Sequence, residues 1–342
     1  MPLSLTDAQQ AADLLANARR ILCFCHRNPD GDAIGSLLGM GLLLEKTFTE
    51  KRVTLHCVDP VPEIFHFLPG VHRVSLPPVP TGGPAEERIQ ANDVMVFLDS
   101  AEPKLTEVHE THPQFFDGTH KTICLDHHYA NPRFATINFI LAEAASTCEI
   151  VLQFADALGW QIDPDIATCL LTGVYTDTGG LLHSNTSPQV YRTVAVLLRR
   201  GARRQSVITA VFRTAKVSTL RLWGRVLEKI TLTEEGGAIS AVTEGDFRAT
   251  GADYSELTGA IDYVNAVPGM RFSLILSEKG GKVKGSLRTL REDVDVSKMA
   301  QKFDGGGHKK AAGFALSGKL RPEVRWKVVD DEKEEREDQK AE

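Results

Sequence analysis

The sequence predicts an α/β protein with two domains joined by a helical connector. A chain of 342 residues is longer than a single hydrophobic core usually spans. Residues 1–200 alternate short apolar segments with helix-like segments, the pattern of a parallel sheet covered by helices on both faces. Residues 230–320 contain short alternating strands with little helix, which indicates a smaller α+β domain. The pattern between them, at 201–229, stays helical and forms the expected connector.

The first domain begins with an amphipathic helix at 6–20, in which Leu14, Leu15 and Ala18 lie on one face. A second helix is expected at 33–46. Short apolar runs predict strands at 21–25, 53–58, 94–98 and 123–125. Because parallel sheets bind ligands at the carboxyl ends of their strands, a site is expected in the residues that follow these strands.

Helices account for the rest of the first domain and are expected at 150–158, 164–176 and 188–200. Thr147 opens the first of them, and Gly159 is a typical residue to end it. Ser187 is a typical N-cap for the third, and Gly201 is a typical residue to end it. A segment rich in proline and glycine, at 77–84, is expected to form a mobile loop.

The second domain is expected to contain mainly short strands, unlike the alternating strands and helices of the first. Its strands are expected at 230–232, 239–242, 272–277, 283–287 and 312–316, with one helix at 255–264. Residues 321–342 form a charged tail that we expect to be disordered. Much of the net charge of −6 lies there, since residues 330–342 carry eight acidic and three basic side chains.

Charge and cysteine content narrow the class of protein. Without its tail the chain is close to neutral, which argues against a protein that wraps long duplex nucleic acid. The six cysteines include no Cys-x-x-Cys pair, so we expect buried, reduced thiols. No apolar segment reaches the roughly 20 residues of a membrane span, and the amino end lacks the pattern of a secretory signal. We therefore expect a cytoplasmic protein.

Acidic and histidine side chains follow the apolar segments of the first domain. His26, Asp30 and Asp32 follow the first strand. The later positions are Asp99, Asp126, His127, His128 and Asp177. Carboxylate and imidazole ligands without a thiolate favour Mn²⁺ or Mg²⁺ over a structural zinc site, and so many acids on one rim would repel each other without cations. The pattern predicts a binuclear site in which a carboxylate bridges two divalent ions roughly 3.5–4 Å apart.

Each of these residues also has a simpler explanation. Asp30 and Asp32 flank Gly31 and could belong to a helix-capping turn. A lone histidine at a strand end is more often a surface or core side chain than a ligand. The triplet at 126–128 is more specific, and the whole set in this order favours a metal site.

The segments 26–32 and 126–128, with Asp99 and Asp177, resemble the four successive motifs of the DHH phosphoesterases. Downstream, the segments 284–289, 305–308 and 311–314 resemble the DHH-associated C-terminal domain. The resemblance covers about residues 5–318 and is strongest to the short bacterial members that act as oligoribonucleases (nanoRNases) and 3′,5′-adenosine-bisphosphate phosphatases. It implies a hydrolase whose active site lies in the cleft between the two domains.

The resemblance implies a role for each matching residue of the first domain. One metal ion would be held by His26 and Asp30. The residues that would hold the other ion are Asp32, His127 and Asp177. Asp99 would bridge both ions and His128 would contact the scissile phosphate, so these two are the implied catalytic residues. Asp126 would support the site. The implied ions are two Mn²⁺, with Mg²⁺ as the alternative.

In the second domain, the resemblance implies a substrate-binding set made of Arg288, Gly305, Gly306, Gly307 and His308. A guanidinium and the N–H groups of a glycine loop both suit phosphate. Many relatives have a fourth glycine in this loop, and some carry an arginine after Asp177 where this chain has none. The second departure leaves the substrate preference open. The general acid is also open among His128, His308 and a metal-bound water.

We therefore expect two-metal hydrolysis of short single-stranded RNA, of about two to five nucleotides, and of nucleotide bisphosphates. Two alternatives within enzymes stay open: a phosphodiesterase of cyclic dinucleotides or their linear products, and a pyrophosphatase or short-chain polyphosphatase. From another class, a non-catalytic nucleotide-binding regulator would be favoured if a metal ligand were missing, and none is. A homodimer is possible, and no membrane partner is expected.

Overall fold

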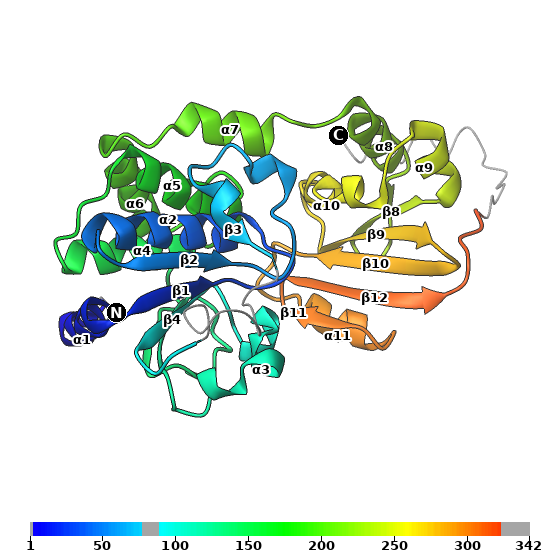
Figure 1. Ribbon diagram of the computed structural model, residues 1–342. Helices are drawn as coiled ribbons and strands as arrows, with labels where there is room; N and C mark the ends of the chain where they lie inside the picture. Colours follow the sequence, from blue (N-terminus) through cyan, green and yellow to red (C-terminus); the bar gives the residue numbers. More distant parts are fainter. Residues whose placement is uncertain (1–2, 77–88, 323–342) are drawn as a thin grey trace, which may run out of the picture. The chain divides into compact units, whose positions relative to one another are not determined.

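The computed structural model describes residues 3–76 and 89–322. The chain divides into two compact units, residues 1–214 and 215–342 (Figure 1). The expected connector, 201–229, contains two helices, α7 (Arg204–Phe212) and α8 (Val217–Glu228), and the units divide between them. The loop expected at 77–84 and all but the first two residues of the expected tail lie outside the described residues.

The first unit contains the expected parallel sheet. Its six strands are β1 (Arg20–Phe24), β2 (Arg52–His56), β3 (Val74–Ser75), β4 (Asp93–Leu98), β5 (Lys121–Asp126) and β6 (Ile137–Ile140). They lie in the order β3-β2-β1-β4-β5-β6, and every neighbouring pair is parallel. β3 and β6 were not predicted. The strand order reverses between β1 and β4, and such a reversal opens a binding crevice at the carboxyl ends of the two strands.

Alternate strand residues face two cores, one on each side of the sheet. Ile21 packs into a core shared with five long helices, α1 (Leu5–Asn17), α2 (Gly31–Thr47), α4 (Thr147–Ala157), α5 (Pro164–Asp177) and α6 (Pro188–Arg199). Leu22 and Phe24 pack with Val108 and Phe115 on the other face. The latter two belong to short segments, α3 (Val108–Thr111) and η4 (Pro113–Phe115). Helices on both faces are confirmed, but those on the second face are short.

The expected helix ends are largely confirmed in the first unit. The side chain of Ser187 accepts a hydrogen bond from the N–H of Val190 at the start of α6. Gly159 and Gly201 follow α4 and α6 with positive φ angles of 67° and 88°. The first helix is shorter than predicted and ends at Asn17, because the chain must turn before Arg20 begins β1.

Helices α2 and α5 touch through their backbones, because α2 carries glycines at every fourth position. A Cβ atom on Gly35 would lie 2.6 Å from the carbonyl oxygen of Cys169 in α5. A Cβ on Gly31 would lie 2.3 Å from the side chain of Thr176, and one on Gly39 would lie 2.6 Å from that of Leu170. Only glycine permits so close an approach, which brings the start of α2 beside the end of α5.

The second unit contains a mixed sheet with the strand order β11-β12-β10-β9-β8-β7. The strands are β7 (Thr231–Leu232), β8 (Gly237–Val242), β9 (Phe272–Lys279), β10 (Lys282–Arg288), β11 (Gly306–His308) and β12 (Ala311–Ser317). Only β8 and β9 are parallel neighbours. Ile275 packs with Leu222 of α8 in one core, and Leu287 packs with Val296 in another. A smaller α+β domain is confirmed.

Some expectations for the second unit were wrong. The helix predicted at 255–264 is split into η5 (Tyr254–Leu257) and α10 (Ala260–Val264), because Gly259 adopts a φ of 90° between them. The glycine segment at 305–308 was expected as a loop, but β11 forms an edge strand there. Two short helices, α9 (Glu244–Thr250) and α11 (Val296–Gln301), were not predicted. Across the described ranges, no helix is both long and apolar enough to cross a membrane.

Candidate active site

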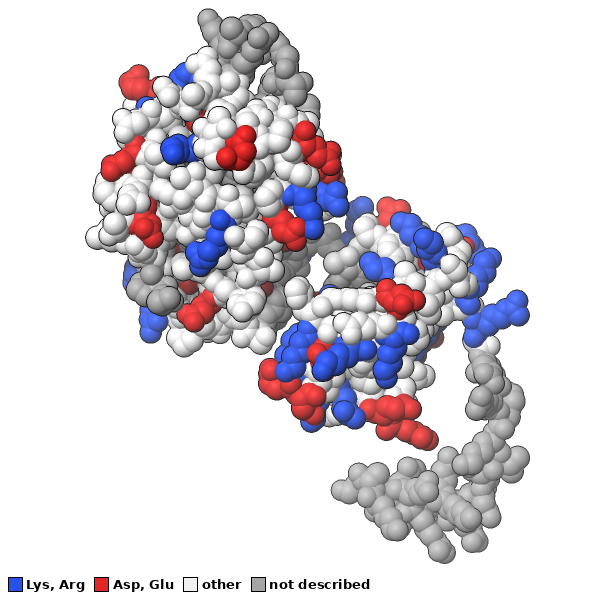
Figure 2. Space-filling model, turned by 90° about the horizontal axis from the view of Figure 1, so that it is seen from below, with Lys and Arg blue, Asp and Glu red and all other residues white. Residues whose placement is uncertain are grey.

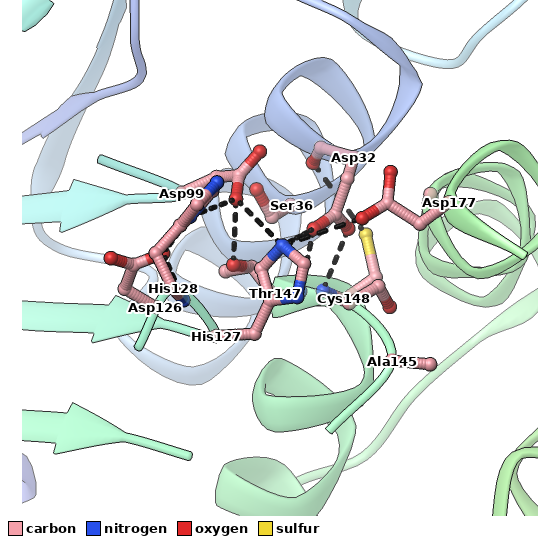
Figure 3. Close-up of polar contacts among 12 residues, drawn as sticks. Asp32, Ser36, Asp99, Asp126, His127, His128, Ala145, Thr147, Cys148 and Asp177 are labelled. Carbon is pink, nitrogen blue, oxygen red and sulfur yellow. Dashed lines mark hydrogen bonds and ion pairs between the residues drawn. The ribbon is translucent and has the colours of Figure 1, made fainter. Parts of the chain in front are cut away.

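The residues predicted to bind metal in the first unit converge at the carboxyl edge of its sheet. Figure 3 shows four of them, Asp32, Asp99, His127 and Asp177. His26 follows β1, Asp99 follows β4, and His127 follows β5. Asp30 and Asp32 stand at the start of α2, and Asp177 is the last residue of α5. The close contact between α2 and α5 thus brings these three acids together at the ends of the strands.

The first group comprises His26, Asp30 and Asp99. Nε2 of His26 lies 3.4 Å from Oδ2 of Asp99 and 3.9 Å from Oδ1 of Asp30. Nδ1 of the same ring contacts the carbonyl oxygen of Arg27 at 2.7 Å, which directs Nε2 toward the acids. Asp30 also caps α2, because its Oδ1 accepts hydrogen bonds from the N–H groups of Asp32 and Ala33. The capping turn is therefore present, and the residue lies in a possible metal site as well.

The second group comprises Asp32, His127 and Asp177. Nε2 of His127 lies 3.3 Å from Oδ2 of Asp177 and 3.9 Å from Oδ2 of Asp32. The Asp32 side chain is fully buried. Its two oxygens accept hydrogen bonds from the N–H groups of Thr147 and Cys148, in the first turn of α4, at 2.5 and 2.9 Å. A helix N-terminus favours a negative charge, so α4 stabilises the Asp32 carboxylate.

Asp99 lies between the two groups. Its Oδ2 faces His26, whereas its Oδ1 lies 3.5 Å from Nε2 of His127 and 3.6 Å from Nδ1 of His128. The residue is buried and adopts a φ of 52°, in the left-handed region that a non-glycine residue seldom occupies. Strain of this kind is concentrated at functional sites. The geometry suits a carboxylate shared by two ions.

His128 points its Nδ1 toward Asp126, with 2.7 Å to Oδ1. The other oxygen of Asp126 accepts a hydrogen bond of 2.7 Å from Asn131, which also donates to the carbonyl oxygen of Ser100. Asp126 is buried, and the His128 side chain is 44% exposed. The predicted roles are a supporting one for Asp126 and a substrate contact for His128, and of the two side chains only that of His128 reaches solvent. The sequence did not identify Asn131, because a single asparagine in a loop carries no distinctive pattern.

The pKa values reflect the crowding of acids. Burial raises the pKa of Asp177 to about 10, and the carboxylates of Asp32 and Asp99 add to the effect. Burial and Asp99 likewise raise the pKa of Asp32 well above its usual range. Burial alone would lower the pKa of His26, but the contact with Asp99 outweighs it and raises that pKa to about 9. The site therefore retains protons at neutral pH where cations would replace them.

The donor set fits divalent metal ions. In the part of the chain that the structure describes, every ion pair made by the four carboxylates of the site is with a histidine and none is with a lysine or arginine. The four are Asp30, Asp32, Asp99 and Asp177. Cys148 is close by, but burial raises the pKa of its thiol, so no thiolate competes as a ligand. Carboxylate and imidazole donors without thiolate match Mn²⁺ or Mg²⁺.

The predicted substrate-binding residues lie at one end of the sheet in the second unit. Arg288 of β10 and His308 of β11 flank β12, because both are register partners of Ala311. Arg288 also lines a cavity of about 250 Å³, together with Lys284, Ser286 and Tyr254. The end of this sheet thus presents basic and hydroxyl groups on one face.

Of the three glycines in the predicted substrate-binding set, two have no room for a side chain and one does. A Cβ on Gly305 would lie 2.3 Å from the carbonyl oxygen of Gly313, and one on Gly307 would lie 2.6 Å from that of Ala311. These two glycines allow β11 and its approach to pair closely with β12. Gly306 has no atom within 4 Å of a Cβ position and is exposed, so packing does not require glycine there.

One segment of the second unit, residues 282–322, is more basic than the near-neutral total implied. Residues 282–322 carry ten Lys or Arg and four Asp or Glu side chains. Figure 2 shows Lys and Arg side chains gathered on this unit, and those of Lys298, Lys302 and Lys309 are exposed. A local excess of positive charge suits an anionic ligand.

Comparison with known proteins agrees with this description. The model of the DHH family, N-terminal domain, matches residues 20–174, and that of the DHHA1 domain matches residues 236–334. The chain is 34% identical to the bifunctional oligoribonuclease and PAP phosphatase NrnA of Thermus thermophilus, over 86% of this chain and 83% of that protein. It is 22% identical to the cyclic-di-AMP phosphodiesterase PdeA of Listeria monocytogenes, over 90% of this chain and 46% of that protein.

A solved structure resembles the fold over nearly its whole length. The exopolyphosphatase-related protein of Bacteroides fragilis superimposes with a TM-score of 0.79 at 24% identity, covering 98% of this chain and 95% of that one. The two matched domains follow each other in the order of the two units. The chain belongs to the DHH family, with a DHH domain followed by a DHHA1 domain.

Proposed function

We propose that the protein is a phosphoesterase that hydrolyses short oligoribonucleotides, of about two to five nucleotides, to mononucleotides, and that it also dephosphorylates 3′,5′-adenosine bisphosphate. The position of Asp99 carries the proposal, because its two oxygens face separate groups of possible metal ligands. The relative from Thermus thermophilus, an oligoribonuclease and PAP phosphatase by name, supports the choice of substrates.

Two divalent cations, Mn²⁺ in preference to Mg²⁺, would occupy the site. His26, Asp30 and Asp99 would hold one, and the residues around the other would be Asp32, His127, Asp177 and Asp99. Bound there, the ions would supply Lewis-acid polarisation of the phosphoryl group and a lowered pKa for a bound water.

The chain's own residues position and stabilise the substrate. Asp126 holds Nδ1 of His128, so Nε2 of that ring is free to donate a hydrogen bond to a phosphoryl oxygen. The hydrogen bond to Asp126 raises the pKa of His128, which keeps a proton on the ring for that purpose. Arg288 and the segment Gly305, Gly306, Gly307 and His308 would bind another phosphate or a base of the substrate.

Product analysis tests the proposal directly. Protein with saturating Mn²⁺ is given a diribonucleotide, 3′,5′-adenosine bisphosphate, a cyclic dinucleotide and pyrophosphate in parallel. We expect mononucleotides from the first and adenosine monophosphate from the second, at rates well above those on the other two. A single-stranded RNA of about 20 nucleotides should react more slowly than the dinucleotide. Faster hydrolysis of pyrophosphate, or no hydrolysis at all, would contradict the proposal.

A second candidate is the hydrolysis of cyclic dinucleotides or their linear dinucleotide products. The similarity to the cyclic-di-AMP phosphodiesterase of Listeria monocytogenes favours it, although this chain matches less than half of that protein. In the parallel assay, this function would appear as a cyclic dinucleotide consumed faster than the short RNA.

A further inference from the structure

Thr147 is the first residue of α4 and lies fully buried beside the candidate metal ligands. Its backbone N–H donates to Oδ2 of Asp32 at 2.5 Å, and its hydroxyl donates to Oδ1 of Asp99 at 3.0 Å. Figure 3 shows the residue between the two acids. A single residue therefore holds carboxylates that come from different elements, one at the start of α2 and one after β4.

The two oxygens that Thr147 holds are the ones that face His127. Nε2 of His127 lies 3.9 Å from Oδ2 of Asp32 and 3.5 Å from Oδ1 of Asp99. The other Asp99 oxygen, Oδ2, is the one that faces His26. Thr147 thus contacts two oxygens in the group around His127 and Asp177, and the structure gives it no bond to Asp30 or His26, which complete the first group.

We propose that Thr147 is a positioning residue for the metal site formed by Asp32, His127, Asp177 and Asp99. This inference rests on the proposed function. The hydroxyl fixes the rotation of the Asp99 carboxylate, so that Oδ1 stays directed toward His127 while Oδ2 stays directed toward His26. Without that bond, the carboxylate is free to turn, and ordering it becomes part of the free-energy cost of binding the ion.

Replacing Thr147 by valine tests the role of its hydroxyl, because valine has nearly the same shape as threonine but no hydrogen-bond donor in its side chain. Thr147→Val keeps the backbone N–H bond to Asp32 and removes only the bond to Asp99, whereas Thr147→Ser keeps both. Thr172→Val is a matched control, since Thr172 is equally buried in the same unit and its hydroxyl donates only to the backbone oxygen of Thr168. If Thr147→Val does not fold, as judged by circular dichroism, Thr147→Ala removes the same bond.

The experiment measures the binding of Mn²⁺ to the full-length, metal-free protein. Titration calorimetry monitors the heat of binding, and electron paramagnetic resonance measures the concentration of free Mn²⁺. We expect the wild type to bind two Mn²⁺ ions. In Thr147→Val, the Kd of at least one ion should rise about 10-fold, because Oδ1 of Asp99 is no longer held toward His127. Thr147→Ser and Thr172→Val should bind like the wild type.

Two results would overturn the inference and leave the proposed function intact. One is a Thr147→Val protein that binds both ions like the wild type. The other is an equal loss of affinity in Thr172→Val, which would show a general effect of burying a valine there. If instead the wild type binds fewer than two ions, the two-metal proposal fails, and the role of Thr147 fails with it.

Discussion

Asp126 and His128 form a hydrogen bond of 2.7 Å between Oδ1 and Nδ1, directly behind the candidate metal site. The aspartate is buried and the histidine reaches solvent, so the pair connects the protein interior to the surface of the first unit. A carboxylate on Nδ1 fixes the tautomer of the ring and leaves Nε2 to face outward. Asn131 holds the second oxygen of Asp126 and completes the arrangement.

Substituting Asp126→Asn should lower kcat on a dinucleotide by about 10²-fold, because the neutral amide no longer favours a protonated His128. Asp126 lies in none of the groups that could hold a metal ion, and His128 lies only in the group with Asp99 and His127, so Mn²⁺ affinity should fall much less than kcat. Steady-state kinetics and a Mn²⁺ titration measure the two effects. Asp117→Asn, at an exposed loop aspartate, is the control. A loss of metal affinity as large as the loss of kcat would argue against this role.

Gly35→Ala should destabilise the first unit by about 1–3 kcal/mol, because a Cβ atom there meets the backbone of α5 at 2.6 Å. Separating α2 from α5 also moves Asp32 away from Asp177, so Mn²⁺ affinity should fall. Thermal unfolding and a Mn²⁺ titration measure both effects. Gly224→Ala in α8 is a matched control, since its Cβ would meet no atom within 4 Å and alanine favours the helix. Equal stability of the two variants would contradict the packing described for α2 and α5.

The metal-free protein should lose stability as pH rises from about 6 to about 9. Asp177 has a pKa of about 10 when folded, against an ordinary value of 3.8, and His26 has a pKa of about 9 against 6.5. In this range the folded state holds protons that the unfolded state releases, so the free energy of unfolding decreases with pH. The thermal midpoint, measured with and without Mn²⁺, checks this.

Saturating Mn²⁺ should reverse that trend, because the ions replace the protons and bind more tightly as pH rises. Asp177→Asn removes one of the titrating groups, so its metal-free midpoint should depend less on pH than that of the wild type. A metal-free midpoint that increases across this range would contradict the crowding of acids at the site.

Arg288→Met should raise KM for a dinucleotide by about 10-fold or more, with little change in thermal stability, because the side chain is only half-buried. Its hydrogen bond to a backbone oxygen, that of Leu287, does not join separate elements. Arg225→Met, at an exposed residue of α8, is the control in the same unit. Steady-state kinetics separates KM from kcat, and an unchanged KM would remove Arg288 from the substrate site.

Much of the fold could be predicted from the sequence, because three strands of the first sheet contain continuous apolar runs and a fourth, β2, is partly apolar. β3 and β6 were missed because they are edge strands of only two and four residues. In the second unit, β11 contains Gly306 and Gly307. Because glycine is typical of loops, the sequence predicts a loop here, although glycine also permits the close pairing of strands. The break at Gly259 shows the opposite case, in which a single positive φ divides an otherwise helical pattern.

Much of the candidate site could also be predicted from the sequence, since three of its candidate metal ligands follow strands whose carboxyl ends meet at one edge of the sheet. His26, Asp99 and His127 converge as expected, and their grouping needed no knowledge of the helices. Thr147 and Asn131 were not identified as supporting residues, because their roles depend on contacts across 48 and five residues of sequence and not on a local pattern. The sequence therefore predicts which strand ends meet, but it does not predict the hydrogen bonds that support the candidate ligands.

The position of manganese in crystals of the protein soaked in Mn²⁺ tests the central claim most directly. Anomalous diffraction at the manganese edge should show two peaks, one beside His26 and Asp30 and one beside His127 and Asp177. The Asp99 carboxylate should lie between them. A single peak, or two peaks away from Asp99, would contradict a binuclear site and the hydrolase proposal that rests on it.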